Sequence, residues 1–95
     1  MNIAIDYDDT FTADPELWSA FVANATARGH QLYMITARRN TMANSDLINA
    51  MLDLWKCQMP IVFCSLGSKL HAVEQRGIKI GIWIDDDPEK LVRGH

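Results

Sequence analysis

The sequence has few cysteines, no long apolar run and no secretory leader, and each absence excludes a class of protein. Its two cysteines, Cys57 and Cys64, lack the close spacing of a zinc site, and no leader precedes the first apolar run. We therefore expect reduced thiols and a cytoplasmic location. No apolar stretch approaches the roughly 20 residues that span a bilayer. Even Ile78–Ile84 is short and contains Lys79, so we expect no membrane insertion.

An excess of positive charge is also absent. Nine Lys and Arg residues stand against twelve Asp and Glu residues, which gives a net charge of −3 with no long run of one sign. The chain therefore has no strong nucleic-acid footprint. With 95 residues, of which 48% are hydrophobic and 22% charged, the composition is that of one globular domain over residues 1–95. Because so short a chain leaves roughly a third or more of its surface exposed, a homo-oligomer is possible.

Short apolar runs alternate along the chain with segments of helical spacing. Each run is apolar throughout, as in strands buried on both faces, and ends in a polar residue or a turn. The predicted strands are Asn2–Ile5, Gln31–Ile35, Ile61–Cys64 and Ile80–Ile84.

Capping residues and apolar spacing mark the helices between these runs. Asp14 before Pro15 is a typical helix start, and Gly29 is a natural stop just after that helix. The predicted helices run from about Pro15 to Arg28, through Leu47 to Trp55, from Lys69 to near Gly77, and briefly from Pro88.

This alternation predicts a doubly wound α/β fold of three layers, in which about four parallel strands are covered by helices on both faces. Ligands in such folds bind at the carboxyl ends of the strands. The residues at those ends are Asp6, Thr36, Cys64 and Asp85.

Carboxylates dominate that edge of the predicted sheet. Four of them are expected to converge: Asp6, Asp8, Asp85 and Asp86. Like charges at short range repel unless a proton or a cation intervenes, and oxygen-only ligands suit Mg²⁺. The plainer interpretation, that acidic residues cap helices and solvate turns, is sufficient for Asp9, Asp14 and Asp87.

Lys69 stands in the first turn of a predicted helix, where the helix macrodipole disfavours a cation. We therefore expect another group to hold it, such as a phosphate or the carboxylate of Asp6. A solvated surface lysine is the alternative.

Four ordered motifs together resemble a known family. They are Asp6-Tyr7-Asp8-Asp9-Thr10, Ile35-Thr36, Lys69 and Ile84-Asp85-Asp86. This pattern is similar to that of the haloacid dehalogenase-like (HAD) phosphatases, and it covers nearly the whole chain.

The resemblance implies a Mg²⁺-dependent phosphohydrolase with a HAD-like Rossmannoid core. Asp6 would be the nucleophile that forms an aspartyl-phosphate, and Asp8 would be the general acid and base. The implied metal ligands are Asp6, the backbone carbonyl of Asp8, Asp85 and, directly or through water, Asp86. Thr36 and Lys69 would hold the phosphoryl group, and Thr10, which we group with the phosphate site, would brace the Asp8 loop.

The sequence departs from the family pattern in having no room for a cap domain and no fifth strand. Another subunit or a bulky phosphorylated substrate would then have to cover the site. Arg38 and Arg39 are the local candidates for binding a second anionic group of the substrate, although a solvated loop explains them equally well. Trp18, Trp55 and Trp83 lie on apolar faces, which predicts core positions or, for one of them, a subunit interface.

Two other functions remain open. A receiver-like phosphoacceptor module uses similar groups, but its phosphorylated aspartate follows the third strand, where this chain has Cys64. A catalytically weak or inactive binding protein of the same fold is the other alternative, and the intact Asp6 and Asp8 argue against it.

Overall fold

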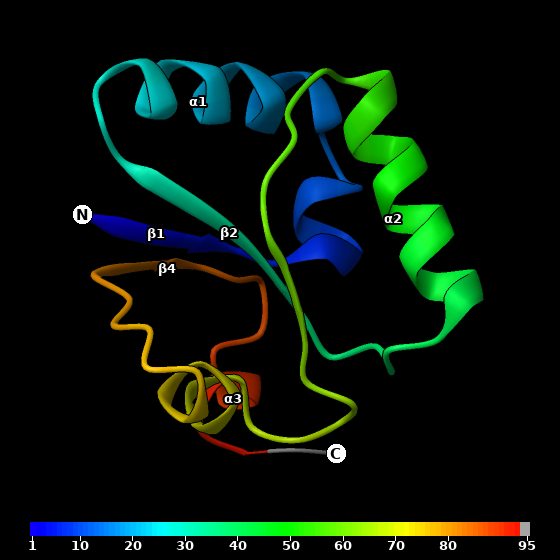
Figure 1. The fold of residues 1–95 in the computed structure, drawn as a ribbon, viewed down its shortest axis with the longest axis vertical. Helices are drawn as coiled ribbons and strands as arrows, with labels where there is room; N and C mark the ends of the chain where they lie inside the picture. Colours follow the sequence, from blue (N-terminus) through cyan, green and yellow to red (C-terminus); the bar gives the residue numbers. More distant parts are fainter. Residues whose placement is uncertain (94–95) are drawn as a thin grey trace.

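The computed structural model describes residues 1–93, so residues 94–95 of the predicted domain lie outside the described residues (Figure 1). The elements alternate as predicted. They are β1 (Asn2–Ile5), the wide turn η1 (Tyr7–Phe11), α1 (Pro15–Ala27), β2 (Gln31–Thr36), α2 (Met42–Leu54), β3 (Ile61–Phe63), α3 (Lys69–Gln75), β4 (Ile82–Ile84) and α4 (Glu89–Val92).

The four strands form one sheet in the order β3-β2-β1-β4, and every neighbouring pair is parallel. From β1 the chain steps outward to β2 and β3, and then returns to the opposite side of β1 for β4. The direction of winding therefore reverses between β1 and β4. In open α/β sheets this switch point opens a crevice at the carboxyl ends of the two strands.

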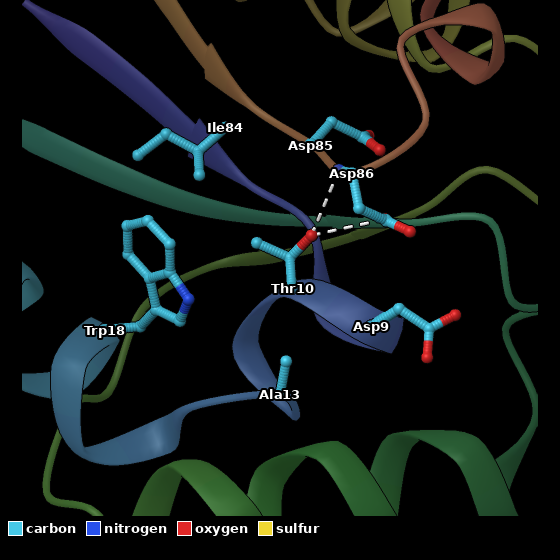
Figure 2. Close-up of a pocket in the computed structure, with 7 residues that line it drawn as sticks. All are labelled: Asp9, Thr10, Ala13, Trp18, Ile84, Asp85 and Asp86. Atoms are coloured by element: carbon cyan, nitrogen blue, oxygen red, sulfur yellow. Dashed lines mark hydrogen bonds between the residues drawn. The ribbon is translucent and has the colours of Figure 1, made fainter.

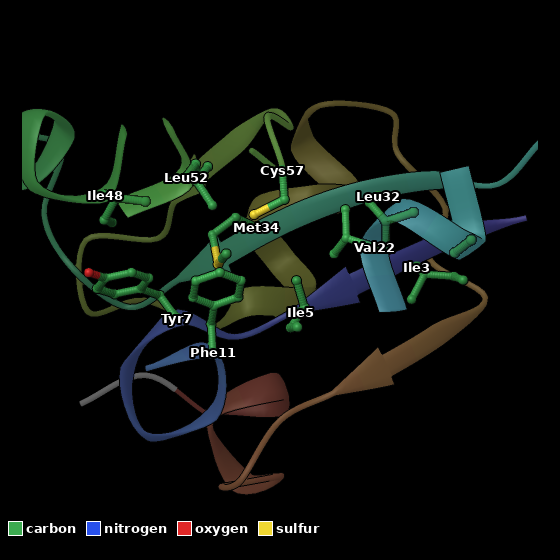
Figure 3. Close-up of a cluster of buried hydrophobic side chains, with 11 residues drawn as sticks. Ile3, Ile5, Tyr7, Phe11, Val22, Leu32, Met34, Ile48, Leu52 and Cys57 are labelled. Carbon is green, nitrogen blue, oxygen red and sulfur yellow. The ribbon is translucent and has the colours of Figure 1, made fainter. Parts of the chain in front are cut away.

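Side chains alternate between the two faces of the sheet, and each face has its own core. Ile3 and Ile5 of β1 belong to the larger cluster, where they join Val22 of α1 and Leu52 of α2 (Figure 3). Ala4 points to the other face, where a smaller cluster contains Val73 of α3. Helices thus cover both faces, which confirms an α/β fold with a four-stranded parallel sheet between helices.

The start of α1 follows the capping residue read from the sequence, and α3 starts at Lys69 as predicted, whereas α2 starts at Met42, five residues before the predicted segment. The Asp14 carboxylate accepts a hydrogen bond from the Leu17 N–H at 3.1 Å, and Pro15 is the first residue of α1. Ser68 caps α3 in the same way and makes Lys69 its first helical residue. Short-range hydrogen bonds of this kind are encoded locally, so these boundaries could be predicted.

The predicted boundaries of two strands were wrong. Cys64 lies beyond β3, and Ile80 and Gly81 precede β4. Before β4, the Asn2 side-chain amide donates to the Lys79 carbonyl, and the Asn2 carbonyl accepts from the Gly81 N–H at 2.8 Å, so one residue of β1 holds the approaching chain through its side chain and its backbone.

The tryptophans are half-buried. Trp18 and Trp55 pack against the larger core and Trp83 against the smaller one, as predicted. Cys57 and Cys64 are free thiols. Among residues 1–93, no helix combines the length and apolar character needed to cross a membrane.

Candidate metal and phosphate site

The turn that follows β1 brings Thr10 back toward Asp6. Two wide-turn hydrogen bonds form it, from Phe11 N–H to Asp6 C=O and from Thr12 N–H to Tyr7 C=O, each 3.1 Å long. Asp9 adopts a left-handed φ of 65°, which aspartate tolerates better than most residues. Sequence reasoning identified this segment as a loop and missed the turn. Its result is that the Thr10 hydroxyl lies 3.2 Å from Asp6 Oδ2.

Lys69 is the cation at the centre of the site. Its Nζ lies 2.6 Å from Asp6 Oδ1 and 2.5 Å from Asp85 Oδ2, so it links the ends of β1 and β4. Only 1% of Lys69 is exposed, and Asp6 is 7% exposed. The solvated-lysine alternative was therefore wrong, and the carboxylates explain why a lysine opens this helix.

Asp86 joins the site through Thr10 (Figure 2). The Thr10 hydroxyl lies 3.2 Å from Asp86 Oδ1 and accepts a bond of 3.2 Å from the Asp86 N–H. Thr10 therefore connects the turn after β1 with the segment after β4. It positions the aspartates, and whether it also contacts phosphate stays a prediction.

Three carboxylates can share a cation. Oxygen atoms of Asp6, Asp85 and Asp86 lie within 4.8 Å of one another. With Lys69 as the counter-charge, the formal charge of the group is −3 + 1 = −2, which a divalent cation would neutralise. The donor set consists of hard oxygens, so the residues fit Mg²⁺. Asp8 does not contribute its side chain to this group among the described residues, and a role for its backbone carbonyl stays a prediction.

Burial sets the proton affinity of the nucleophile candidate. Loss of solvent raises the pKa of Asp6 to about 6, against the opposing effect of Lys69. Burial also lowers the pKa of Lys69, but its bonds to Asp6 and Asp85 outweigh this and leave a net upward shift. The pKa of the exposed Asp86 is lowered, chiefly by its interaction with the Asp6 carboxyl group. Asp6 and Asp86 thus differ in their affinity for protons, because burial raises the pKa of Asp6 whereas the hydrogen-bonded interaction with Asp6 lowers the pKa of Asp86.

Asp8 is held by Arg38 through a two-pronged ion pair. Arg38 Nε lies 2.9 Å from Asp8 Oδ2, and Nη2 lies 2.8 Å from Oδ1. The guanidinium also donates to Asn44 at 3.0 Å and lies 5.5 Å from the centre of the Tyr7 ring. Sequence reasoning placed Arg38 near the substrate but missed its pairing with Asp8. The 30 positions that separate the two residues give no local signal for it.

Thr36 lies at the end of β2, as predicted, and is fully buried. Its hydroxyl accepts a hydrogen bond of 3.2 Å from the Arg38 N–H, so it shapes the start of the loop that presents Arg38. Contact between Thr36 and a phosphoryl group stays a prediction.

A cavity of about 300 Å³ adjoins the acidic group on the side of Thr10 and Asp86 (Figure 2). Its apolar wall consists of Ala13, Trp18 and Ile84. Sequence reasoning expected Trp18 in the core and missed its position beside the site. The position of Ile84 beside the site could be predicted, because Ile84 directly precedes Asp85. The position of Trp18 could not, because nothing local reveals that α1 lies next to the end of β4.

Comparison with known proteins adds no relative: no family model matches the sequence, and no curated protein or solved structure does either.

Proposed function

We propose that this protein is a Mg²⁺-dependent phosphomonoesterase in which Asp6 attacks phosphorus. One observation supports this above all: a buried carboxylate lies at the switch point between β1 and β4, paired with a lysine and beside two further carboxylates. A purely structural ion pair needs one carboxylate for each lysine. Here Lys69 pairs with two carboxylates and a third lies beside them, and a divalent cation would balance the excess negative charge.

In the first step, an Asp6 oxygen forms a bond to phosphorus while the bond from phosphorus to the leaving oxygen breaks. The product is an aspartyl-phosphate. Asp8, two residues further along the chain, gives its proton to the leaving oxygen. Lys69 neutralises charge on Asp6 and on the phosphoryl oxygens, which is the principal demand of phosphoryl transfer.

In the second step, water attacks the phosphorus of the aspartyl-phosphate. Asp8 takes a proton from that water, the bond from phosphorus to Asp6 breaks, and inorganic phosphate leaves. The two steps together return Asp6 to the free carboxylate and Asp8 to its protonated form. Thr10 keeps Asp6 and Asp86 in place throughout.

Asp6, Asp85 and Asp86 would hold the Mg²⁺ ion. When bound, the ion supplies positive charge that offsets the carboxylates and the phosphate. Lys69 already performs part of this role, because it contacts two of the three carboxylates.

The Asp8–Arg38 pair has to open for Asp8 to act, because Arg38 occupies both Asp8 oxygens. An anionic substrate offers Arg38 an alternative partner. We propose that Arg38 transfers to the substrate, and that the freed Asp8 carboxylate takes up a proton from solvent before the first step. About a third of the Arg38 side chain is exposed, which gives it access to such a ligand.

The decisive experiment measures hydrolysis of an aryl phosphate with and without Mg²⁺, by the unchanged protein and by Asp6→Asn. We expect metal-dependent turnover that Asp6→Asn reduces at least about 1,000-fold, because the nucleophile is lost. Asp9→Asn is the matched control, since Asp9 is an exposed aspartate of the same turn. Equal turnover by Asp6→Asn would contradict the proposal.

A binding protein without turnover is the second candidate. The burial of Thr36 and Lys69 and the occupied Asp8 oxygens favour it, since they describe a closed site. Calorimetric titration with Mg²⁺ separates the two: binding that Asp85→Asn abolishes, with no hydrolysis of any phosphate ester, would favour the binding protein.

A further inference from the structure

β4 is an edge strand whose outer side has no partner strand within residues 1–93. Its inner side pairs with β1, and the Ile84 carbonyl accepts a bond of 2.9 Å from the Asp6 N–H. Successive residues of a strand direct their backbone groups to opposite edges. The N–H and C=O of Trp83 therefore face outward, where another strand could bind them.

The side chains of β4 are apolar on both faces. Ile82 is 44% exposed, and Ile84 and Trp83 are half-buried. Most open edges carry a charge or a proline that discourages pairing. This edge carries neither within β4.

The two ends of β4 carry opposite charges. Lys79 precedes the strand, and Arg28, the residue after α1, lies with Ile82 around a cavity of about 250 Å³ beside it. The acidic segment 85–87 follows the strand. An antiparallel neighbour with the same sequence would bring each basic end to an acidic end, whereas a parallel neighbour would bring like charges together.

We infer that two copies of this chain associate by antiparallel pairing of β4 about a two-fold axis at Trp83. In this register the Trp83 residues exchange two backbone hydrogen bonds. Residue numbers of opposed positions within β4 sum to 166, so Ile82 of each copy faces Ile84 of the other. Lys79 and Asp87 lie beyond the two ends of β4, so Lys79 of one copy and Asp87 of the other come to the same end of the paired strands. The result is one sheet of eight strands, four from each copy.

A second exposed apolar surface serves as the control for this inference. Leu47 and Leu54 of α2 are 47% and 72% exposed, so α2 could also attract a partner. Unlike β4, this surface offers no unpaired strand edge. Leu47 and Ile82 are almost equally exposed, which makes them a matched pair for substitution.

The test is sedimentation equilibrium of the full chain over a range of protein concentrations. We expect a dimer of 2 × 10.8 = 21.6 kDa. Ile82→Lys should raise the dissociation constant about 100-fold or more, and Leu47→Lys should leave it within about threefold. A monomer at every concentration, or a dimer that Leu47→Lys disrupts and Ile82→Lys does not, would overturn the inference.

Charge exchange provides a second test that does not alter the apolar strand. Lys79→Asp should weaken the dimer about tenfold, and adding Asp87→Lys should restore it, because the pair is then re-formed with reversed polarity. The Trp83 amide should also exchange its hydrogen more slowly as the dimer forms. Amide exchange independent of protein concentration, or no rescue by the double variant, would contradict the proposed register.

Discussion

Lys69 and Arg38 both pair with aspartates at the carboxyl end of the sheet, but in opposite surroundings. The side chains of Lys69, Asp6 and Asp85 are 1%, 8% and 3% exposed. Those of Arg38 and Asp8 are 32% and 45% exposed. The first group has lost its water, whereas the second can exchange partners with solvent.

The difference in exposure gives the two ion pairs different roles, because the buried one supports the fold and the exposed one can open. A desolvated charge depends on every partner that remains, so the buried group must stay assembled or lose much of its stability. An exposed pair contributes little to stability and opens readily. A site of this design keeps its proposed nucleophile fixed while its proposed acid and base is free to change partners.

Removing the buried cation should have the largest effect on the free energy of unfolding. Lys69→Met leaves Asp6 and Asp85 buried without a counter-charge, and we expect a loss of about 3–5 kcal/mol in the free energy of unfolding at neutral pH without metal. Urea unfolding measures this. Lys56→Met, at an exposed lysine, should change it by less than about 0.5 kcal/mol. A similar small change in both variants would mean that the buried pair does not hold the fold together.

Neutralising the buried anion should have a smaller effect of opposite sign. The folded-state pKa of Asp6 is about 6, above its ordinary value of 3.8. Its contribution to stability is therefore fully present below pH 3.8 and is lost as the pH rises through 6. Asp6→Asn should raise the metal-free unfolding free energy at pH 8 by on the order of 1–3 kcal/mol, because asparagine resembles the protonated acid.

The pH dependence of that gain is the critical readout. Unfolding should be followed by urea titration from pH 8 to pH 5 in both proteins. The advantage of Asp6→Asn should shrink as the pH falls through 6, where the unchanged protein takes up a proton. Asp9→Asn should show no such trend, and a gain that stays constant across this range would argue against a raised pKa at Asp6.

Breaking the exposed pair should have the smallest effect on stability. Arg38→Gln should lower the unfolding free energy by less than about 1 kcal/mol, and 1 M salt should reduce this further because it screens exposed charges. If the proposed hydrolysis is found, the same variant should raise KM more than it lowers kcat, since Arg38 would bind an anionic part of the substrate. A loss of several kcal/mol would show that the pair supports the fold.

Features set by neighbouring residues could be predicted from the sequence. The start of α1 followed from Asp14 with Pro15, and the start of α3 was predicted at Lys69. The acidic ends of β1 and β4 were placed together because parallel strands direct their carboxyl ends to one edge. The position of Lys69 in the first turn of a helix also indicated an anionic partner, because the helix start alone gives a lysine no favourable interaction.

Contacts across long stretches of chain could not be predicted. The Asp8–Arg38 pair and the position of Trp18 beside the site depend on how the loop after β2 and helix α1 pack. The wide turn at Tyr7–Phe11 depends on hydrogen bonds that no short motif specifies, and sequence periodicity does not register it. The sequence indicated an open edge only through the expected absence of a fifth strand. That the edge strand is β4, with opposite charges at its two ends, follows from the strand order.

The hydrogen bonds of Thr10 and Lys69 join residues that lie far apart along the chain. Lys69 reaches back 63 positions to Asp6, and Thr10 reaches forward 76 positions to Asp86. Closing such long loops costs chain entropy, which must be overcome before the contacts form. The site is therefore assembled only when β4 pairs with β1, and cation binding by the three carboxylates would report that the whole sheet has formed.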